Sequence, residues 1–239
     1  MKSIEVFFTP DLYDYRHNDD PQQVVVLDIL RATTAICTAI YAGVKGIIPV
    51  ADVQDLKKFK ENGYLIASER EGIKVDFADF GNSPFTFLDN DLKGKSIAYS
   101  TTNGTLAIEK VAESSSQVLI GAYSNISVLC NYLIEQNQSV IVVCSGWKGK
   151  FSLEDAIVAG AFCEKLMESG KFLIDCDSAN ASLDLWNIAK NNLLEYVEKC
   201  THRVRLRKLK LDDVLEYCFT ADKAPVVPIF KDGIIQKKK

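Results

Sequence analysis

The chain has 239 residues, of which 47% are hydrophobic and 25% are charged, values typical of a folded globular domain. Its 28 lysines and arginines are outnumbered by 32 aspartates and glutamates, which gives a formal net charge of -4 and argues against general binding of DNA or RNA. No apolar run reaches membrane-spanning length, and the N-terminus lacks the basic start and long apolar stretch of a signal peptide. We therefore expect a cytoplasmic protein.

Cysteine and histidine usage narrows the class further. Seven cysteines are scattered without a CxxC pair, and the two histidines, His17 and His202, show no paired metal-ligand spacing. An odd number of dispersed cysteines predicts reduced, mostly buried thiols rather than a disulfide framework or a zinc ribbon. A zinc enzyme is not expected.

The elements predicted in chain order alternate between strands and helices. Strands are expected at residues 24–27, 46–51, 64–67, 97–100, 118–122, 140–144 and 226–230. The first helix is expected to follow residue 28 and to end near residue 41, and further helices are expected at 55–61, 106–112, 126–136, 152–168, 183–199 and 212–219. A basic stretch lies at residues 202–210, and Asp232-Gly233 predicts a hairpin turn.

The strand composition predicts how the elements pack. Near-continuous β-branched runs at 24–27 and 140–143 are typical of strands that are buried on both faces by helices. The alternation of strands and helices indicates an α/β fold with three layers, α/β/α, around a largely parallel or mixed sheet. One domain covering residues 1–239 is the simplest organisation.

The corner after the first of these strands carries two functional candidates, because open parallel sheets bind ligands beyond the carboxyl ends of their strands. Asp28 directly follows the valine-rich strand, where a carboxylate suits Mg²⁺ binding or attack on phosphorus; a helix N-cap explains the same residue structurally. Arg31 suits bidentate phosphate binding, with a surface ion pair as the alternative.

The corner at residues 100–105 (Ser-Thr-Thr-Asn-Gly-Thr) offers hydroxyls, an amide and backbone N–H groups at the start of a helix. This composition favours an anion-binding cradle over an ordinary turn with an N-cap.

The corner before the helix at 152–168 combines a cationic loop with two acids. Ser152-Leu153-Glu154-Asp155 matches a capping box, which explains Asp155 structurally and leaves Glu154 unexplained. Two acids in one helical turn place carboxylates near the pocket of Asp28, a donor set that suits a hard divalent cation. The loop at 146–150 either brings a cation to a second anionic group of the substrate or is solvated.

A long connection at residues 69–84 adds Glu69, Arg70, Asn82 and Ser83, and long loops in compact domains are commonly functional. The patterns GxGxxG, GxxxxGK[ST], DxD after the first strand and Cys-x5-Arg are absent. Their absence argues against dinucleotide, P-loop, haloacid-dehalogenase and tyrosine-phosphatase chemistry.

In these segments the chain resembles the 2-phosphosulfolactate phosphatase (ComB) family of the coenzyme M pathway. The resemblance is carried, in order, by residues 25–34, 68–72, 80–84, 100–105 and 146–155, and by Val227-Pro228. It implies a ComB-like fold and a Mg²⁺-dependent phosphatase that converts (2R)-2-phospho-3-sulfolactate to 3-sulfolactate and phosphate. The basic stretch at 203–210 departs from the more neutral segment expected of the family.

The resemblance also implies the site residues. We assign catalytic roles to Asp28, Arg31 and Glu69, and metal binding to Asp28, Glu69, Glu154 and Asp155. We assign substrate or phosphate binding to Asn82, Ser83, Thr101, Thr102, Asn103, Gly104, Thr105, Trp147 and Lys148, with Lys148 or Arg70 binding the sulfonate or carboxylate.

Chemistry and substrate stay open between named alternatives. Asp28 either forms an aspartyl-phosphate or holds a metal that activates water, and Cys144 is expected to be a buried thiol rather than a nucleophile. The alternative functions are the same chemistry on another small phosphorylated hydroxy acid, or non-catalytic anion binding. We expect a small-molecule partner, with neither nucleic acid nor membrane, and a homodimer as the commonest arrangement.

Overall fold

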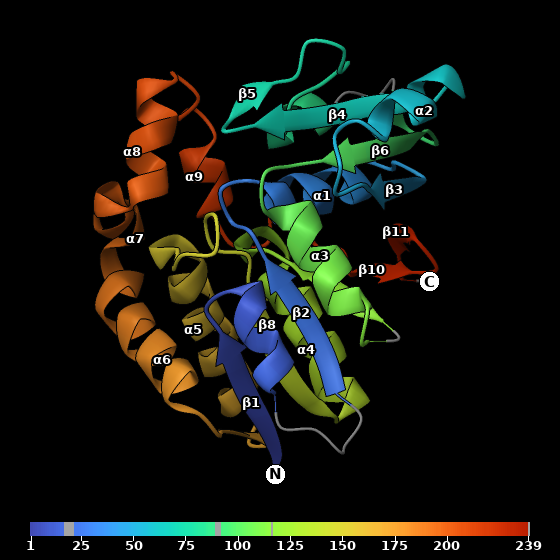
Figure 1. The fold of residues 1–239 in the computed structure, drawn as a ribbon. Helices are drawn as coiled ribbons and strands as arrows, with labels where there is room; N and C mark the ends of the chain where they lie inside the picture. The colour runs from blue at the N-terminus through green and yellow to red at the C-terminus, as the bar shows by residue number, and fades with distance from the viewer. Residues whose placement is uncertain (17–21, 89–91, 116, 239) are drawn as a thin grey trace.

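The computed structural model describes residues 1–16, 22–88, 92–115 and 117–238, and these form a mixed α/β fold built on one sheet (Figure 1). The sheet has eleven strands in the order β5-β4-β6-β3-β11-β10-β7-β2-β8-β1-β9. The strands are β1 (Lys2–Phe7), β2 (Gln22–Leu27), β3 (Gly46–Pro49), β4 (Leu65–Arg70), β5 (Ile73–Lys74), β6 (Ser96–Ser100), β7 (Val118–Gly121), β8 (Ser139–Cys144), β9 (Phe172–Ile174), β10 (Pro228–Lys231) and β11 (Ile234–Lys237).

Nine α-helices lie in the described part of the chain. They are α1 (Ala32–Tyr41), α2 (Leu56–Glu61), α3 (Gly104–Ala112), α4 (Ile126–Gln136), α5 (Leu153–Glu168), α6 (Asp177–Ala189), α7 (Leu193–Tyr196), α8 (Thr201–Lys208) and α9 (Leu215–Cys218). Two 3₁₀ helices matter for packing, η1 (Pro10–Tyr15) and η2 (Pro84–Leu88). None of the described helices is long and apolar enough to cross a lipid bilayer.

The sheet consists of two parallel blocks joined by the C-terminal hairpin. β4, β6 and β3 are parallel to one another, as are β7, β2, β8, β1 and β9. The hairpin β10–β11 lies between the blocks and pairs antiparallel on both sides, with Ile229 opposite Leu119 and Ile235 opposite Ile47. The expected turn at Asp232-Gly233 connects these two strands and is confirmed.

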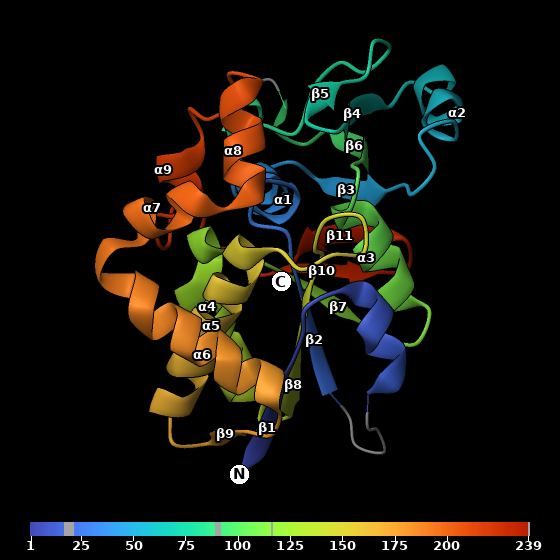
Figure 2. The ribbon, with the colours of Figure 1, turned by 60° about the vertical axis from the view of Figure 1, so that its left-hand side comes forward.

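Alternate residues of the central strand point into different cores, which confirms the three-layer α/β/α prediction. Val25 and Leu27 belong to the core under α4, α5 and α6, whereas Val24 and Val26 belong to the core under α1 and α3. Figure 2 shows this arrangement, with α4–α6 on one side of β2 and β8 and α3 on the other. Burial on both faces is what the unbroken valine run predicts.

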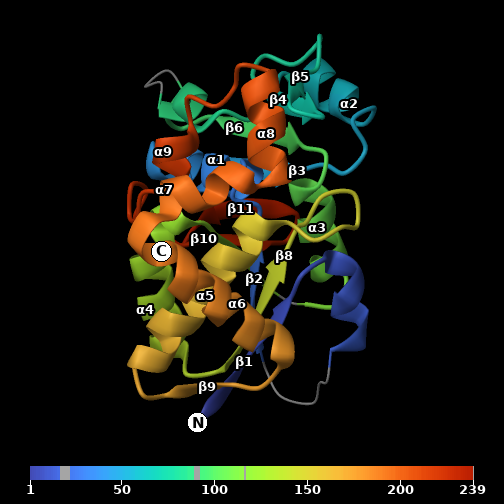
Figure 3. The same cartoon turned by 90° about the vertical axis from the view of Figure 1, so that its left-hand side faces the viewer.

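Several predicted elements differ from those observed. β1, β5 and β9 were not expected, and the helix predicted at 183–199 is α6, which begins at Asp177, followed by short helical turns. The basic stretch at 202–210 forms α8 over most of its length. In Figure 3, α8 extends from α7 toward the end of the molecule that holds β4 and β6, so this segment packs against the body of the fold.

Candidate active site

The corners that follow different strands meet in the structure, joined by hydrogen bonds between loops. The N–H of Ile29 after β2 donates to Oδ1 of Asp155 at 2.9 Å. The N–H of Lys148 after β8 donates to Oδ1 of Asn103 at 2.9 Å, and the N–H of Thr102 after β6 donates to Oε1 of Glu69 at 2.8 Å. The corner residues predicted separately therefore form one site.

Asp28 lies in the middle of this site and is 7% exposed. Its Oδ1 accepts the N–H of Ala32 at 3.2 Å, so the carboxylate binds the first residue of α1, although the N-cap residue of this helix is Arg31. Its Oδ2 accepts no hydrogen bond from a described residue and faces Gly104, where a Cβ would lie 2.9 Å away. One side chain thus combines the two roles that the sequence allowed, a structural bond through Oδ1 and a carboxylate oxygen available for chemistry.

The acids around Asp28 perturb one another. Burial raises the pKa of Asp28 to about 6; His202 and the Ala32 N–H act against this shift, while the charges of Glu69 and Glu154 add to it. Burial also raises the pKa of Asp155 well above its usual range, with further contributions from Glu154 and Asp28. These mutual effects show that the predicted acids gather in one low-dielectric site.

Asp155 has a different structural role from the one predicted. The Ser152 side chain makes no capping bond, so the expected capping box does not form. Instead, Asp155 accepts the N–H of Ile29 through Oδ1 and the N–H of Gly146, at 3.3 Å, through Oδ2. Two N–H groups from neighbouring strand-end loops provide a hydrogen bond to each oxygen of this buried carboxyl, which a single bond within a capping box would not do.

Glu69 is buried at the end of β4 and fixes the Thr102 loop. Its Oε1 accepts the Thr102 N–H, and its Oε2 accepts the Gly72 N–H at 2.6 Å and the Thr102 hydroxyl at 3.2 Å. These three bonds hold the strand-end loops of β4 and β6 together. They also occupy much of the carboxylate that the sequence assigned to catalysis and metal binding.

Arg31 is 3% exposed at the start of α1, and its guanidinium makes no ion pair or hydrogen bond with any described residue. The surface ion pair considered for it is therefore wrong. The Tyr99 hydroxyl is buried and has no hydrogen-bond partner among the described residues, and the charges of Asp28, Glu69 and Arg31 affect its pKa. A buried guanidinium without a protein partner is costly unless an anion completes it.

The Thr101–Thr105 corner spends most of its hydrogen-bonding groups internally. The Thr101 N–H donates to the Thr105 hydroxyl at 3.2 Å, and the Thr105 N–H donates to the Thr101 hydroxyl at 3.3 Å. Thr102 is bound to Glu69, as above. The N–H groups of Asn103 and Gly104 donate to no residue that the structure describes, so the predicted cradle is reduced to these two donors.

Asn82 and Ser83 precede η2, which packs on α1. The Asn82 side chain is buried, and its Oδ1 has no hydrogen-bond partner in the described chain. Ser83 is half-buried and accepts the Thr86 N–H through its carbonyl oxygen at 3.3 Å. Asn82 Oδ1 thus resembles the Arg31 guanidinium as a buried polar group without a hydrogen-bond partner among the described residues.

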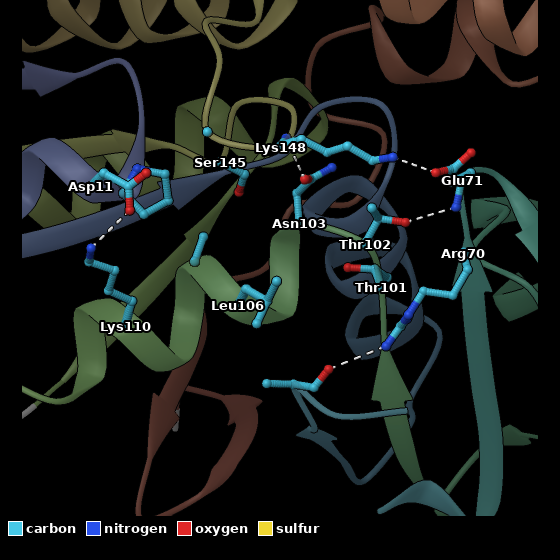
Figure 4. A pocket seen from close by; sticks show the side chains of 14 residues that line it. Asp11, Arg70, Glu71, Thr101, Thr102, Asn103, Leu106, Lys110, Ser145 and Lys148 are labelled. Atoms are coloured by element: carbon cyan, nitrogen blue, oxygen red, sulfur yellow. Dashed lines mark hydrogen bonds and ion pairs between the residues drawn. The ribbon is translucent and has the colours of Figure 1, made fainter. Parts of the chain in front are cut away.

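A cavity of about 520 Å³ opens beside these corners (Figure 4). Its lining includes Thr101, Thr102, Asn103, Ser145, Arg70 and Lys148. Three cationic side chains line it, Arg70, Lys110 and Lys148, and all three are engaged; Lys110 is paired with Asp11 and Asp14. Arg70 donates to the carbonyls of Glu69 and Ala51 and to the Ser100 hydroxyl, and Lys148 is paired with Glu71 across the mouth of the cavity.

Two residues of α8 belong to the site and were not predicted. A second cavity, of about 300 Å³, is lined by Trp147 and Glu154 together with His202 and Arg205. His202 Nδ1 lies 3.2 Å from Glu154 Oε1, and the Arg205 guanidinium stacks 3.4 Å from the centre of the Trp147 ring. The signal in the sequence is their three-residue spacing, which places both on one helical face.

The predicted metal ligands are only partly available. Over the described ranges, no three or more His, Cys, Asp or Glu side chains are gathered as a metal site, and His17 lies outside those ranges. Hydrogen bonds from N–H groups engage both oxygens of Asp155 and both of Glu69. This leaves Asp28 Oδ2 and Glu154, whose Oε1 lies 3.2 Å from His202 Nδ1. One or two carboxylates completed by water and phosphate oxygens are a common Mg²⁺ environment, so these residues fit that ion.

Comparison with known proteins gives consistent matches. The family model described as 2-phosphosulpholactate phosphatase matches residues 7–233. Proteins named probable 2-phosphosulfolactate phosphatase from Caldanaerobacter subterraneus and Microcystis aeruginosa are each 38% identical to this chain; the first match covers 90% of both chains, and the second covers 98% of this chain and 99% of the relative. A protein of the same name from Thermotoga maritima is 34% identical, over 90% of this chain and 92% of the relative.

Proposed function

The chain belongs to the 2-phosphosulfolactate phosphatase family, and on this basis we propose that it hydrolyses (2R)-2-phospho-3-sulfolactate. In this reaction one water is consumed, the bond between phosphorus and the C2 oxygen breaks, and the products are 3-sulfolactate and inorganic phosphate. The protein is thus proposed to be a phosphoric monoester hydrolase that acts in the cytoplasm, in the coenzyme M pathway implied by the resemblance.

The observation that carries this proposal is the unpaired Arg31 beside Asp28. A guanidinium that is 3% exposed and has no partner among the described residues is suited to an anion with several oxygens. Asp28 Oδ2, without a hydrogen bond from a described residue, lies at the same strand end. A bound phosphate ester would complete the Arg31 charge and face a carboxylate, as phosphoryl transfer requires.

Charge balance supports Mg²⁺ as the cofactor. The substrate carries a phosphate, a sulfonate and a carboxylate, and it would enter a site that already contains Asp28, Glu69 and Glu154. We propose that Asp28 and Glu154 hold the ion. When bound, Mg²⁺ would offset the phosphate charge and assist departure of the leaving oxygen. In this proposal Arg31 binds and orients the phosphate, and Asp155 holds the loops that follow β2 and β8 in register.

The route of phosphoryl transfer is tested at Asp28. Direct attack by water needs its carboxylate to orient a cation, whereas the covalent route needs Asp28 itself to attack phosphorus and form an aspartyl-phosphate. Quenching single turnovers of substrate labelled with ³²P distinguishes the routes, because only the covalent route transfers label to the protein. Asp28→Asn should abolish turnover by either route, and full activity of this variant would contradict the assignment.

The decisive assay is release of inorganic phosphate from racemic phosphosulfolactate, with Mg²⁺ and with EDTA, beside a panel of phosphorylated hydroxy acids. Selective, Mg²⁺-dependent release supports the proposal. Release from another acid alone retains the mechanism and changes the substrate. Phosphate binding without release from any compound indicates an anion-binding protein.

A further inference from the structure

The substrate proposed above has anionic groups beyond its phosphate, and the cations first assigned to them are engaged elsewhere. Arg70 donates to two carbonyls and a hydroxyl, and Lys148 is paired with Glu71 at an exposed position. Neither side chain offers a guanidinium or ammonium group that is free and held in the site. Another cation is needed for the sulfonate or the carboxylate.

Arg205 has the properties that these two residues lack. Its guanidinium lies flat against Trp147, 3.4 Å from the ring centre, and its Nη1 is buried without a hydrogen-bond partner in the described chain. Stacking fixes the plane of the guanidinium and leaves its N–H groups free along the edges. The side chain lines the 300 Å³ cavity together with Trp147, Glu154 and His202.

The position of Arg205 places this cavity beside the proposed phosphate site. Glu154 and Glu69 influence the ionisation of both Asp28 and Arg205, so the arginine lies close to the same acids. None of these acids is within ion-pair distance of Arg205 in the described chain. The cavity thus adjoins the reacting centre through Glu154, and besides Lys150 and Lys199 its lining contains the Arg205 guanidinium, which pairs with no described carboxylate.

The neighbouring arginines of α8 show that this arrangement is particular to one position. Arg203 is paired with Glu198 and Asp212, and Arg207 is also paired with Glu198. Of the three arginines in α8, only Arg205 projects into the cavity and lacks a carboxylate partner among the described residues. The same helix therefore separates two structural arginines from one that is available to a ligand.

We propose that Arg205 binds the sulfonate of the substrate and determines the preference for phosphosulfolactate over esters without a sulfonate. The planar fork of N–H donors matches two oxygens of a sulfonate group, and Trp147 holds that fork in place. This assignment rests on the proposed function and extends it from the reacting phosphate to the rest of the substrate.

The test compares matched substrates and matched variants. 2-Phosphoglycerate keeps the phosphate and carboxylate and replaces the sulfonate by a hydroxyl, whereas 2-phosphoethanesulfonate keeps the sulfonate and lacks the carboxylate. Arg205→Met removes the charge, Arg205→Lys keeps the charge without the planar fork, and Arg207→Met is a control on the exposed face of α8. Circular dichroism and thermal unfolding check that each variant is folded.

We expect Arg205→Met to lower kcat/KM for phosphosulfolactate and 2-phosphoethanesulfonate by about 100-fold, as the loss of a charge-assisted contact predicts, and for 2-phosphoglycerate by less than about threefold. Arg205→Lys should recover part of the loss, and Arg207→Met should match the wild type. A folded Arg205→Met variant that loses activity equally on all substrates, or on none, would overturn the assignment.

The same data separate this inference from the proposed function. If the wild-type protein does not hydrolyse phosphosulfolactate, the proposed function fails and the sulfonate assignment fails with it. If the wild type hydrolyses phosphosulfolactate but Arg205→Met keeps the full preference for it over 2-phosphoglycerate, only the assignment of Arg205 fails. Equilibrium binding of 3-sulfolactate and glycerate to the two proteins provides a readout that does not depend on turnover.

Discussion

Replacement of Arg31 by methionine tests whether its missing partner is the substrate. The change removes a charge that makes no ion pair within the described chain and keeps a side chain of similar length. We expect kcat/KM to fall strongly while the free energy of unfolding of the ligand-free protein stays the same or rises, since the change removes a buried charge and breaks no described ion pair.

The size of the activity loss follows from the contacts that a phosphate would make. A charged hydrogen bond contributes about 1.5 to 3 kcal/mol, and a bidentate arginine makes two. Their loss amounts to about 3 to 6 kcal/mol, or roughly 10² to 10⁴ in kcat/KM at about 1.4 kcal/mol for each factor of ten. Arg31→Lys should recover only part of the activity, because an ammonium group cannot form the same fork.

Arg203 provides the matched control, because it is a buried arginine that does have partners. Its guanidinium lies 2.9 Å from Glu198 and from Asp212. Both acids are partly exposed, so we expect Arg203→Met to cost about 1 to 3 kcal/mol of stability, with a smaller effect on kcat/KM than Arg31→Met. Urea unfolding and phosphate-release assays measure both quantities.

The opposite outcome refutes the reasoning. If Arg31→Met destabilises the ligand-free protein as much as Arg203→Met and leaves kcat/KM nearly unchanged, then Arg31 is a structural residue. The phosphate would then be bound elsewhere in the site.

Four further predictions concern Asp28 and its surroundings. Because its pKa is raised to about 6, we expect kcat/KM to fall as the pH drops below about 6, and added Mg²⁺ to move this fall to lower pH. A wild-type kcat/KM that does not change between about pH 4 and 7 would contradict this. Because the pKa of Asp28 is higher in the folded than in the unfolded protein, ionisation of this group lowers the stability of the metal-free protein as the pH rises from about 4 to 6. The loss is up to about 3 kcal/mol. Unfolding measured as a function of pH should show it for the wild type and not for Asp28→Asn. Gly104→Ala places a Cβ 2.5 Å from the Cβ of Ala32 and 2.9 Å from Asp28 Oδ2. It should lower the free energy of unfolding by about 1 to 3 kcal/mol and reduce turnover. The control Gly81→Ala, whose nearest contact would be 3.8 Å away, should be far less destabilising in urea unfolding. Cys144 is fully buried and its thiol pKa is raised well above the usual range by burial, so Cys144→Ala should keep activity within a few-fold, and iodoacetamide inactivation that depends on Cys144 would contradict its role as a core residue.

Local sequence patterns predicted the central elements of the fold because the apolar runs and turn residues that define these elements lie within a few consecutive positions. The valine runs of β2 and β8 and the Asp232-Gly233 turn are examples. β9 has only three residues and is defined by pairing with β1, which no short window reveals. The helix at residues 201–208 was not predicted because its many charged residues give no apolar pattern. Its buried residues are Arg203 and Leu206, and a buried arginine cannot be recognised from sequence when its ion-pair partners are unknown.

The same limit applies to the site. Sequence patterns placed Asp28 at a strand end and Glu154 and Asp155 in the first turn of a helix, and the structure brings them together. It assigned Asp155 to a capping box because a cap is a local pattern, whereas its observed partners, Ile29 and Gly146, belong to loops after two other strands. His202 entered the site only through the path of α8, which brings it back to Glu154.

The pairing of charges separates the arginines of this protein in a way that residue type does not. Arg31, Arg203 and Arg205 are chemically the same, yet among the described residues carboxylates pair with Arg203 and not with the other two. A buried cation that folding leaves without a partner lowers stability, and this cost is offset when a ligand supplies the anion. On this argument two anionic groups of one substrate should complete Arg31 and Arg205, and 3-sulfolactate with inorganic phosphate should raise the thermal stability of the wild type more than of either methionine variant.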